Sequence, residues 1–289
     1  MLAEIQHQLR AAGDHLHSHG IDSLPEACAA IPLEVFGALQ IDRPDSAQRL
    51  LQLLPTMPSD EVQLLWTGAS GHTLLAHSLS FVRTLAGHFP TRTPRPRADM
   101  TLLDFGCGWG RLLRLACKFV RPSHLWGVDP WDRSIELCKE HGVLADLRMS
   151  PWIPRELDVP QDLDVIYAFS VFTHLPEELA VIALRTLTRH LAIGGRLLLS
   201  VRPVEYWAWH DFSAAGARGY SRERAEGEHR STGYTFVPHD RPPIEGIVAY
   251  GDSSMTVAFA ERLAAPLRLV GLEWSAADTL QLVLVFEKL

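Results

Sequence analysis

The segment Met100–Leu113 reads M-T-L-L-D-F-G-C-G-W-G-R-L-L and decides how the chain folds. Its first part, 101–105, is short and apolar, which predicts a buried strand. The G-C-G triplet at 106–108 predicts a turn in which a side chain would block the approach of the backbone to a ligand. From Trp109 onward, leucine and alanine recur at helical spacing, so the turn is expected to open a helix. This order of elements builds a nucleotide-type binding site at the carboxyl end of a parallel strand.

The third glycine of the turn distinguishes between classes of nucleotide. The dinucleotide pattern G-x-G-x-x-G needs a glycine at position 111, where this chain has Arg111. The chain has G-x-G-x-G at 106–110 instead, with an aspartate two residues ahead of it. The string D-F-G-C-G-W-G resembles motif I of the class I S-adenosylmethionine (SAM)-dependent methyltransferases. The resemblance implies that the following residues bind the cofactor: Asp104, Gly106, Cys107 and Gly108.

A carboxylate follows the next apolar segment. H-L-W-G-V at 124–128 predicts a second strand that ends at Asp129. Asp129 follows Asp104 by 25 residues, close to the offset of about 20 residues at which a carboxylate binds the ribose hydroxyls. We therefore expect Asp129 and Pro130 to border the nucleoside, with the Trp131 ring against the adenine. The alternative role of Asp129 is to cap the helix that follows.

Two further strand ends are expected to complete the cofactor pocket. The third strand is followed by Ser150 and lacks the carboxylate with which relatives often bind the adenine amine, so Ser150 or a backbone group would replace it. The fourth strand, 163–169, is followed by S-V-F-T-H-L-P-E-E, which is similar to the post-strand motif of the same family. The resemblance places Phe169 and Ser170 beside the cofactor and His174 near the methyl-transfer pocket. His174 is then either a general base or a residue that fixes the loop.

Strands and helices alternate regularly from 104 to 201, which predicts a parallel sheet with right-handed crossovers. The final segment, 280–288, resembles the antiparallel seventh strand of these methyltransferases. The expected fold is therefore α/β: a Rossmann-like, seven-stranded, mostly parallel sheet with an antiparallel last strand, helices on both faces and a helical N-terminal cap. We expect the cap at 1–95 and the methyltransferase core at 96–289, with an insertion at about 203–253.

The insertion is rich in aromatic rings, glycine and charge, and insertions at this point of the fold commonly build the acceptor pocket. Its charge run at 218–230 is expected to be a solvated surface. The large rings at 206–209 are expected to pack on the core or line a substrate cleft, because so many rings are not left in water. For an oxygen acceptor the candidate catalytic bases are His174, His210 and Asp211, in that order. A nitrogen or sulfur acceptor that is already deprotonated can react without a base.

The composition limits the class of protein. The 289 residues are 47% hydrophobic and 21% charged, as in globular proteins with a sizeable core. The formal net charge of −7 argues against a non-specific nucleic-acid binder, which needs a basic face. No apolar run approaches the ~18–20 residues of a membrane span, and the first residues lack the apolar region of a secretory signal. We therefore expect a cytoplasmic protein with neither nucleic acid nor membrane as partner.

Two groups of residues with possible metal or redox chemistry are interpreted as structural. The four cysteines lack C-x-x-C spacing and are expected to be reduced thiols, with Cys107 as a packing residue rather than a nucleophile. The histidines at 15, 17 and 19 alternate, which suits a strand or a flexible tail, and no cysteine or carboxylate cluster joins them. We expect no metal site.

Together these features predict a methyltransferase that moves a methyl group from SAM to the oxygen or nitrogen of a small molecule by in-line displacement, leaving S-adenosylhomocysteine (SAH). The acceptor and the oligomeric state stay open. One alternative, an NAD- or FAD-dependent oxidoreductase, shares the glycine turn and Asp129 but predicts glycine in place of Arg111 and a sheet that stays parallel after the fifth strand. Another is a catalytically degenerate protein that binds SAM without turnover.

Overall fold

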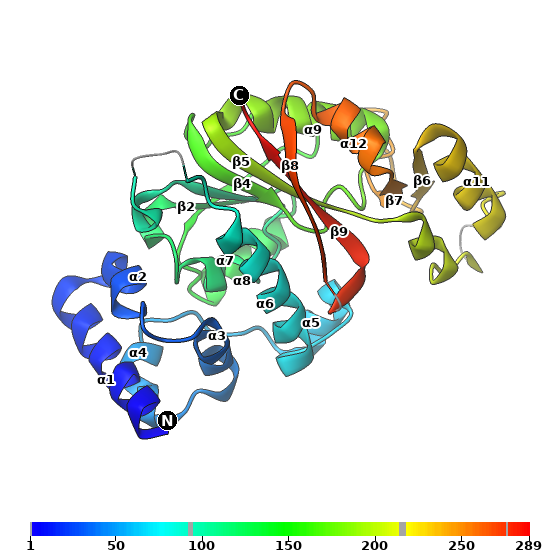
Figure 1. Ribbon diagram of the computed structural model, residues 1–289. Coiled ribbons are helices and arrows are strands. Elements are labelled where there is room, and N and C mark those ends of the chain that lie inside the picture. The colour runs from blue at the N-terminus through cyan, green and yellow to red at the C-terminus, as the bar shows by residue number, and fades with distance from the viewer. Residues whose placement is uncertain (1, 92–94, 214–217, 276) are drawn as a thin grey trace. The chain divides into compact units, whose positions relative to one another are not determined.

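The computed structural model describes residues 2–91, 95–213, 218–275 and 277–289 (Figure 1). Within it the chain divides into two compact units, Met1–Met149 and Ser150–Leu289. Residues 92–94, next to the expected end of the cap, and 214–217 of the expected insertion lie outside the described residues.

Seven strands form one sheet, in the order β3-β2-β1-β4-β5-β9-β8. Their bounds are β1 (Leu102–Phe105), β2 (Leu125–Asp129), β3 (Asp146–Met149), β4 (Leu163–Ala168), β5 (Leu191–Val201), β8 (Arg268–Ser275) and β9 (Asp278–Glu287). β1 and β3 pair parallel to β2, and β4 pairs parallel to β5. β9 pairs antiparallel to both β5 and β8. This topology confirms the expected Rossmann-like class with an antiparallel last strand.

The first unit begins with helices. They are α1 (Leu2–His19), α2 (Leu24–Ala27), α3 (Leu33–Asp42), α4 (Gln48–Leu51), α5 (Asp60–Thr67) and α6 (Gly71–Gly87). α1 packs on α2 and α4, and α3 packs on α6. The strand or flexible tail expected around the three histidines is wrong, because these residues lie in α1. Leu9, Ala12 and Leu16 are buried at helical spacing, and this apolar stripe outweighs the alternation of the histidines.

The glycine turn after β1 delays the helix that follows it. Helix α7 (Leu113–Ala116) begins at Leu113 and not at Trp109, because turns occupy the residues between. Gly106, Gly108 and Gly110 have φ values of 79°, 53° and 79°, which a right-handed helix does not contain. A Cβ atom at Gly110 would also lie 2.7 Å from a methyl group of Val143. Helix α8 (Asp132–Glu140) then follows β2.

The second unit contains α9 (Glu177–His190), α12 (Val257–Ala264) and α11 (Arg222–Thr232). α9 and α12 lie side by side (Figure 1). A separate two-stranded antiparallel sheet, β6 (Tyr234–Pro238) and β7 (Gly251–Met255), was not expected from the sequence. β7 reads G-D-S-S-M, which lacks β-branched and aromatic residues, yet all five residues are buried. Contacts with other segments, rather than strand propensity, therefore hold β7 in place.

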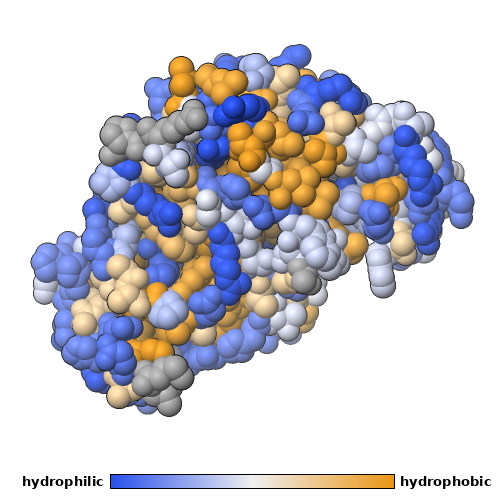
Figure 2. Space-filling model, in the orientation of Figure 1, coloured by the Kyte–Doolittle hydropathy of each residue, from blue (hydrophilic) through white to orange (hydrophobic). Residues whose placement is uncertain are grey.

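The charge run of the insertion forms α11. Its arginines and glutamates pair at a spacing of four residues, as in Arg222–Glu226 and Arg224–Glu228, and Figure 2 shows a hydrophilic surface over this helix. The solvated surface expected at 218–230 is confirmed for the outward side, while Ala225 and His229 are buried.

Strand β8 has exposed apolar side chains, unlike the outward side of α11. Val270, Leu272 and Trp274 are exposed, and an apolar area covers this strand in Figure 2.

Candidate functional site

The glycine turn and the end of β2 form what we call the nucleoside region, residues 104–108 and 129–131 of the first unit. The backbone N–H groups of Gly106 and Cys107 both donate to the carbonyl of Val128, at 2.8 and 3.0 Å. The N–H of Gly108 donates to Oδ2 of Asp129 at 2.9 Å. The turn is therefore fixed to the second strand by its own backbone, at the carboxyl end of the sheet where ligands bind in this class of fold.

Asp129 is buried, and its hydrogen-bond donors among the described residues are neutral. Its Oδ1 accepts from the N–H of Trp131 at 3.0 Å and from the hydroxyl of Ser134 at 2.8 Å. Burial raises the pKa of Asp129 above its usual range, and the hydrogen bonds from Trp131, Gly108 and Ser134 offset part of that effect. No cation is among these determinants. The carboxylate is thus held in one orientation, with Oδ2 accepting the hydrogen bond from Gly108 and able to accept another.

The ring of Trp131 stands at the edge of the nucleoside region. Trp131 is 46% exposed, and one of its faces stacks on Trp66 of α5, with ring centroids 4.5 Å apart and planes 13° from parallel. A Cβ atom at Gly108 would lie 3.9 Å from the Trp66 ring. Trp66 therefore stacks on Trp131 and lies near the outer side of Gly108. No feature of the sequence predicted this arrangement.

Asp104 and Cys107 lie beneath the glycine turn. Both residues are buried, and the thiols of Cys107 and Cys138 approach the same carbonyl oxygen of Gly108, at 3.6 and 3.2 Å. A hydrogen bond with Cys138, followed by burial, raises the pKa of Cys107 well above that of a free thiol. A neutral thiol is a poor nucleophile, which agrees with the expectation that Cys107 packs.

In the second unit, the turn after β4 is fixed from neighbouring strands. Ser170 has a φ of 59°, and its N–H donates to Oγ of Ser200 at 2.6 Å. The Ser200 hydroxyl in turn donates to Gln281 of β9 at 2.6 Å. A strained turn held in this way is typical of a functional loop. Phe169 and Ser150 are the other two expected cofactor contacts of this unit. Phe169 directly precedes Ser170, and Ser150 is a buried residue that directly follows β3.

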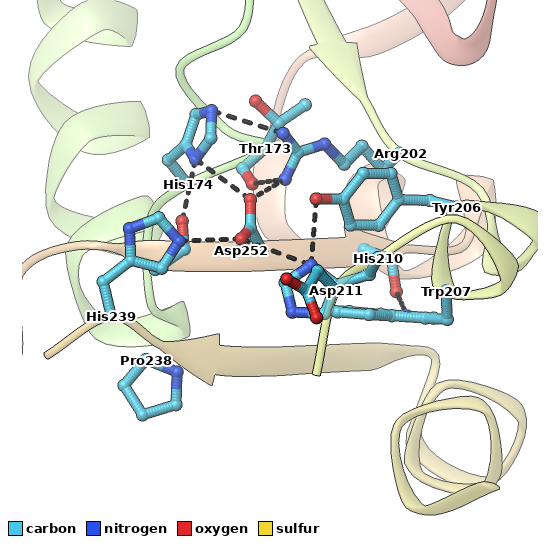
Figure 3. Close-up of polar contacts among 12 residues, drawn as sticks. Thr173, His174, Arg202, Tyr206, Trp207, His210, Asp211, Pro238, His239 and Asp252 are labelled. Carbon is cyan, nitrogen blue, oxygen red and sulfur yellow. Dashed lines mark hydrogen bonds and ion pairs between the residues drawn. The ribbon is translucent and has the colours of Figure 1, made fainter. Parts of the chain in front are cut away.

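Beyond that turn, five side chains surround the buried carboxylate of Asp252 (Figure 3). We call this group the Asp252 cluster: His174, Arg202, Tyr206, His210, His239 and Asp252. Arg202 donates to Oδ1 of Asp252, and Nε2 of His239 lies 2.7 Å from Oδ2. Burial alone would raise the pKa of Asp252, but the His239 hydrogen bond and the charge of Arg202 outweigh it and hold the pKa well below its usual value. Asp252 is therefore ionised.

The tautomer of His174 follows from its two partners. Nε2 lies 3.3 Å from a guanidinium nitrogen of Arg202, and Nδ1 lies 2.8 Å from the carbonyl oxygen of Gly251. Because arginine only donates, Nε2 accepts and Nδ1 carries the proton. Burial, followed by the charge of Arg202, lowers the pKa of His174 to about 4. His174 is a neutral imidazole with both nitrogens engaged, which suits a residue that fixes the loop.

The other two candidate bases differ in where they point. Nδ1 of His210 lies 3.2 Å from the Tyr206 hydroxyl and 3.5 Å from Oδ2 of Asp252, so His210 belongs to the Asp252 cluster. Asp211 is exposed, and its carboxylate accepts from the N–H and hydroxyl of Ser213 at 2.8 and 2.9 Å.

The aromatic side chains of the insertion differ in whether they are buried or exposed. Trp207 is 1% exposed and donates from Nε1 to Ser254 at 2.7 Å, and Tyr206 lies under the guanidinium of Arg202 at 4.0 Å. The expectation that these rings are not left in water holds for both. It is wrong for Trp209, which is 78% exposed, because the end of its short helical turn faces outward.

Comparison with known proteins adds the family. Residues 103–197 match the family model described as a methyltransferase domain. The fold is similar to that of a Pyrococcus horikoshii protein, at 12% identity over 74% of this chain and 90% of that chain, with a TM-score of 0.51. A SAM-dependent methyltransferase of Methanosarcina mazei matches at 18% identity over 66% of this chain and 93% of that chain, with a TM-score of 0.48. No match was found among curated proteins.

The domain match coincides with the strand, glycine turn and carboxylate that carry motif I. The segment 103–197 is therefore similar to a methyltransferase domain. SAM is the cofactor that its resemblance to motif I implies, and SAM supplies an activated methyl group when bound. The antiparallel pairing of β9 with β5 fits this family and departs from the continuing parallel sheet that an oxidoreductase would have.

The residues of the nucleoside region fit SAM as a ligand. Among the described residues, a Cβ atom at Gly108 would meet only the Trp66 ring within 4 Å, and the Asp129 carboxylate is fixed by its hydrogen bonds. Among the residues that the structure describes, no helix is long and apolar enough to cross a membrane, and no three histidine, cysteine or acidic side chains are placed to hold a metal ion.

Sequence reasoning missed four residues of these sites: Trp66, Arg202, His239 and Asp252. Asp252 lies in a polar segment whose burial depends on distant partners, including Thr173, which accepts from the N–H of Ser253 at 2.8 Å. The available signal was the resemblance of 250–255 to a family segment, which marks the segment without showing what the carboxylate contacts.

Proposed function

We propose that this chain is a cytoplasmic enzyme that transfers the methyl group of SAM to the oxygen or nitrogen of a small-molecule acceptor by in-line displacement. The observation that carries the proposal is the Asp252 cluster, which gathers polar side chains at the carboxyl ends of β4 and β5. His174 follows β4 and Arg202 follows β5, and ligands bind at this edge of such sheets. Asp252 and His210 come from the insertion, which thereby supplies the acceptor side of the site.

The cofactor contacts are proposed for each unit by itself. In the first, Asp129 accepts from the ribose hydroxyls, and the backbone of the glycine turn lines the methionine end. Pro130 and Trp131 border the adenine. In the second, the expected contacts are Ser150, Phe169 and Ser170. Asp104 is assigned a supporting role beneath the turn, because its side chain is 2% exposed.

For an oxygen acceptor, the geometry favours His210 over His174 and Asp211 as the proton acceptor. Nδ1 of His210 faces Tyr206 and Asp252, and no described residue is bonded to its Nε2. His174 has no uncommitted nitrogen, and Asp211 is engaged with Ser213. The structure adds His239, whose Nε2 faces Asp252 and whose side chain is 38% exposed. Burial lowers the pKa of His210, and the charge of Asp252 offsets part of that effect.

The test combines cofactor titration with a methyl-transfer screen. Calorimetry with SAM, SAH and NAD is expected to show binding of the first two only, and NAD binding without SAM binding would defeat the proposal. Labelled SAM is then offered with small hydroxyl and amine compounds. His210→Gln is expected to lower kcat for a hydroxyl acceptor. His72→Gln is the matched control, because His72 forms an exposed pair with Asp42 at 2.8 Å. Tight SAM binding without any transfer would favour the catalytically degenerate alternative.

A further inference from the structure

We propose that Trp66, on helix α5 of the N-terminal cap, fixes the ring of Trp131 as the wall against which the adenine of SAM lies. Trp66 would thus be a positioning residue for cofactor binding, acting through Trp131. It lies outside the segment 103–197 that matches the methyltransferase family, so it is a contribution of this chain's own cap. The inference depends on SAM as cofactor and not on the proposed acceptor.

The stack leaves one face of Trp131 for the ligand. The two indoles are in contact, with centroids 4.5 Å apart and planes 13° from parallel, so no third ring fits between them. Trp131 nevertheless remains 46% exposed. An adenine that stacks on Trp131 therefore uses the face that Trp66 does not cover.

The position of this wall is tied to the ribose anchor. The backbone N–H of Trp131 donates to Oδ1 of Asp129 at 3.0 Å, which fixes the main chain two residues beyond the carboxylate. The side chain of an exposed tryptophan would still sample several rotamers, and binding would have to restrict it. The Trp66 stack restricts the ring before the ligand arrives, and this preorganisation strengthens binding.

Trp66 is itself held from two sides. Its ring packs against a buried cluster of Leu74, Trp109 and Leu137, which joins α6, the glycine turn and α8. The buried side chain of Gln63, in the same helix, donates to the carbonyl of Pro58 at 2.8 Å and accepts from the N–H of Gly71 at 3.1 Å. Through Gln63, helix α5 is therefore hydrogen-bonded both to the segment just before its own start and to the first residue of α6.

A second anchor lies just before α5. Arg114 is 2% exposed; it donates to the carbonyl of Thr56 and lies over the ring of Trp109, 4.8 Å from its centroid. These bonds join the segment leading into α5 to the helix that follows the glycine turn. A movable gate would need a segment with few such bonds, so the contacts favour a fixed support for Trp131.

The first experiment measures affinity by calorimetry in the full chain. Trp66→Ala is expected to raise the Kd of SAM by about 3- to 10-fold, the range of a lost aromatic pair, while Trp66→Phe recovers most of the affinity. 5′-Methylthioadenosine, which has the nucleoside but no amino acid, should lose the same factor. Trp274→Ala, which removes an exposed ring on β8, is the matched control and should leave the Kd unchanged. Thermal melts verify that each variant is folded.

The second experiment separates support from direct contact. If Trp66 acts through Trp131, Trp66→Ala should have no further effect on the Kd in a chain that already carries Trp131→Ala. Circular dichroism from the coupled indoles should be present without ligand and persist when SAM binds.

Several results would overturn the inference while SAM binding itself stays intact. An unchanged Kd in Trp66→Ala would leave Trp66 with a role in stability alone, and a tighter Kd would make it a gate that competes with adenine. Equal losses in the presence and absence of Trp131 would make Trp66 a direct contact. Absence of SAM binding in the unmodified chain would instead contradict the cofactor assignment.

Discussion

The two buried carboxylates of this protein have opposite environments. Asp129 in the nucleoside region accepts from two backbone N–H groups and a hydroxyl of the described residues, and burial raises its pKa. Asp252 accepts from Arg202 and His239, which outweigh burial and lower its pKa. The first carboxylate gains from further donors such as ribose hydroxyls, whereas the second already has its cation and serves to position its neighbours. Under the proposed function, Asp129 binds the cofactor and Asp252 orients the side chains around it. The two carboxylates differ in whether a cation is among their partners.

The largest effect is expected from Asp252→Asn. The variant leaves the guanidinium of Arg202, only 12% exposed, without its counter-charge, and removal of one partner of a buried pair costs about 3–5 kcal/mol of unfolding free energy. Urea unfolding measures the change. A loss below about 1 kcal/mol would show that Asp252 behaves as a surface carboxylate, and the comparison with Asp129 would fail.

The pH dependence of stability is expected to include His174. The folded chain holds its pKa near 4, whereas the unfolded chain has the ordinary value of 6.5. Between these values the unfolded state binds the extra proton, so stability falls as the pH falls, by at most about 3 kcal/mol. His174→Gln should flatten the stability curve in this window, measured by urea unfolding from pH 7.5 to 4. His72→Gln, an exposed histidine, should leave the slope unchanged; equal slopes in all three proteins would contradict the assignment.

Asp129→Ala tests the other carboxylate. Loss of a charge-assisted bond to a ribose hydroxyl is expected to weaken SAM binding by about 1.5–3 kcal/mol, or roughly 10- to 150-fold in Kd. Binding by the unmodified chain should also weaken as the pH falls through the raised pKa of Asp129, because hydroxyl donors favour the ionised form. Calorimetry at several pH values measures both. An affinity independent of this substitution would remove Asp129 from the ribose site.

The smallest effect is expected from removing an exposed ion pair, which contrasts with the buried pair of Asp252 and Arg202. Glu245→Gln removes an ion pair with Arg155 in which both side chains are about 60% exposed, and such pairs contribute less than about 1 kcal/mol. The measurement is the same urea titration used for Asp252→Asn. A loss as large as that of Asp252→Asn would mean that burial does not decide the effect of these charges.

The sequence predicted the nucleoside region because its determinants are local. The apolar strand, the glycine turn and Asp129 lie within one stretch, and the bond from Gly108 to Asp129 joins neighbouring strands. β6 and β7 were missed because their residues are buried by distant segments rather than by an apolar pattern. The partners of His174 could not be predicted for the same reason, since Gly251 and Arg202 reach it from separate parts of the chain. The acceptor side of the site therefore required the structure.

The span of these bonds has a consequence for the order of folding. The bond from Gly108 to Asp129 closes 21 residues, whereas the bond between His174 and Gly251 closes 77. Longer closures carry a larger entropic penalty, and contacts distant in sequence form late. We expect pulsed hydrogen exchange during refolding to protect the amide of Gly108 before that of Gly251; the reverse order would refute this. During synthesis of the chain, the nucleoside region would then form before the Asp252 cluster, which is the proposed acceptor side of the site.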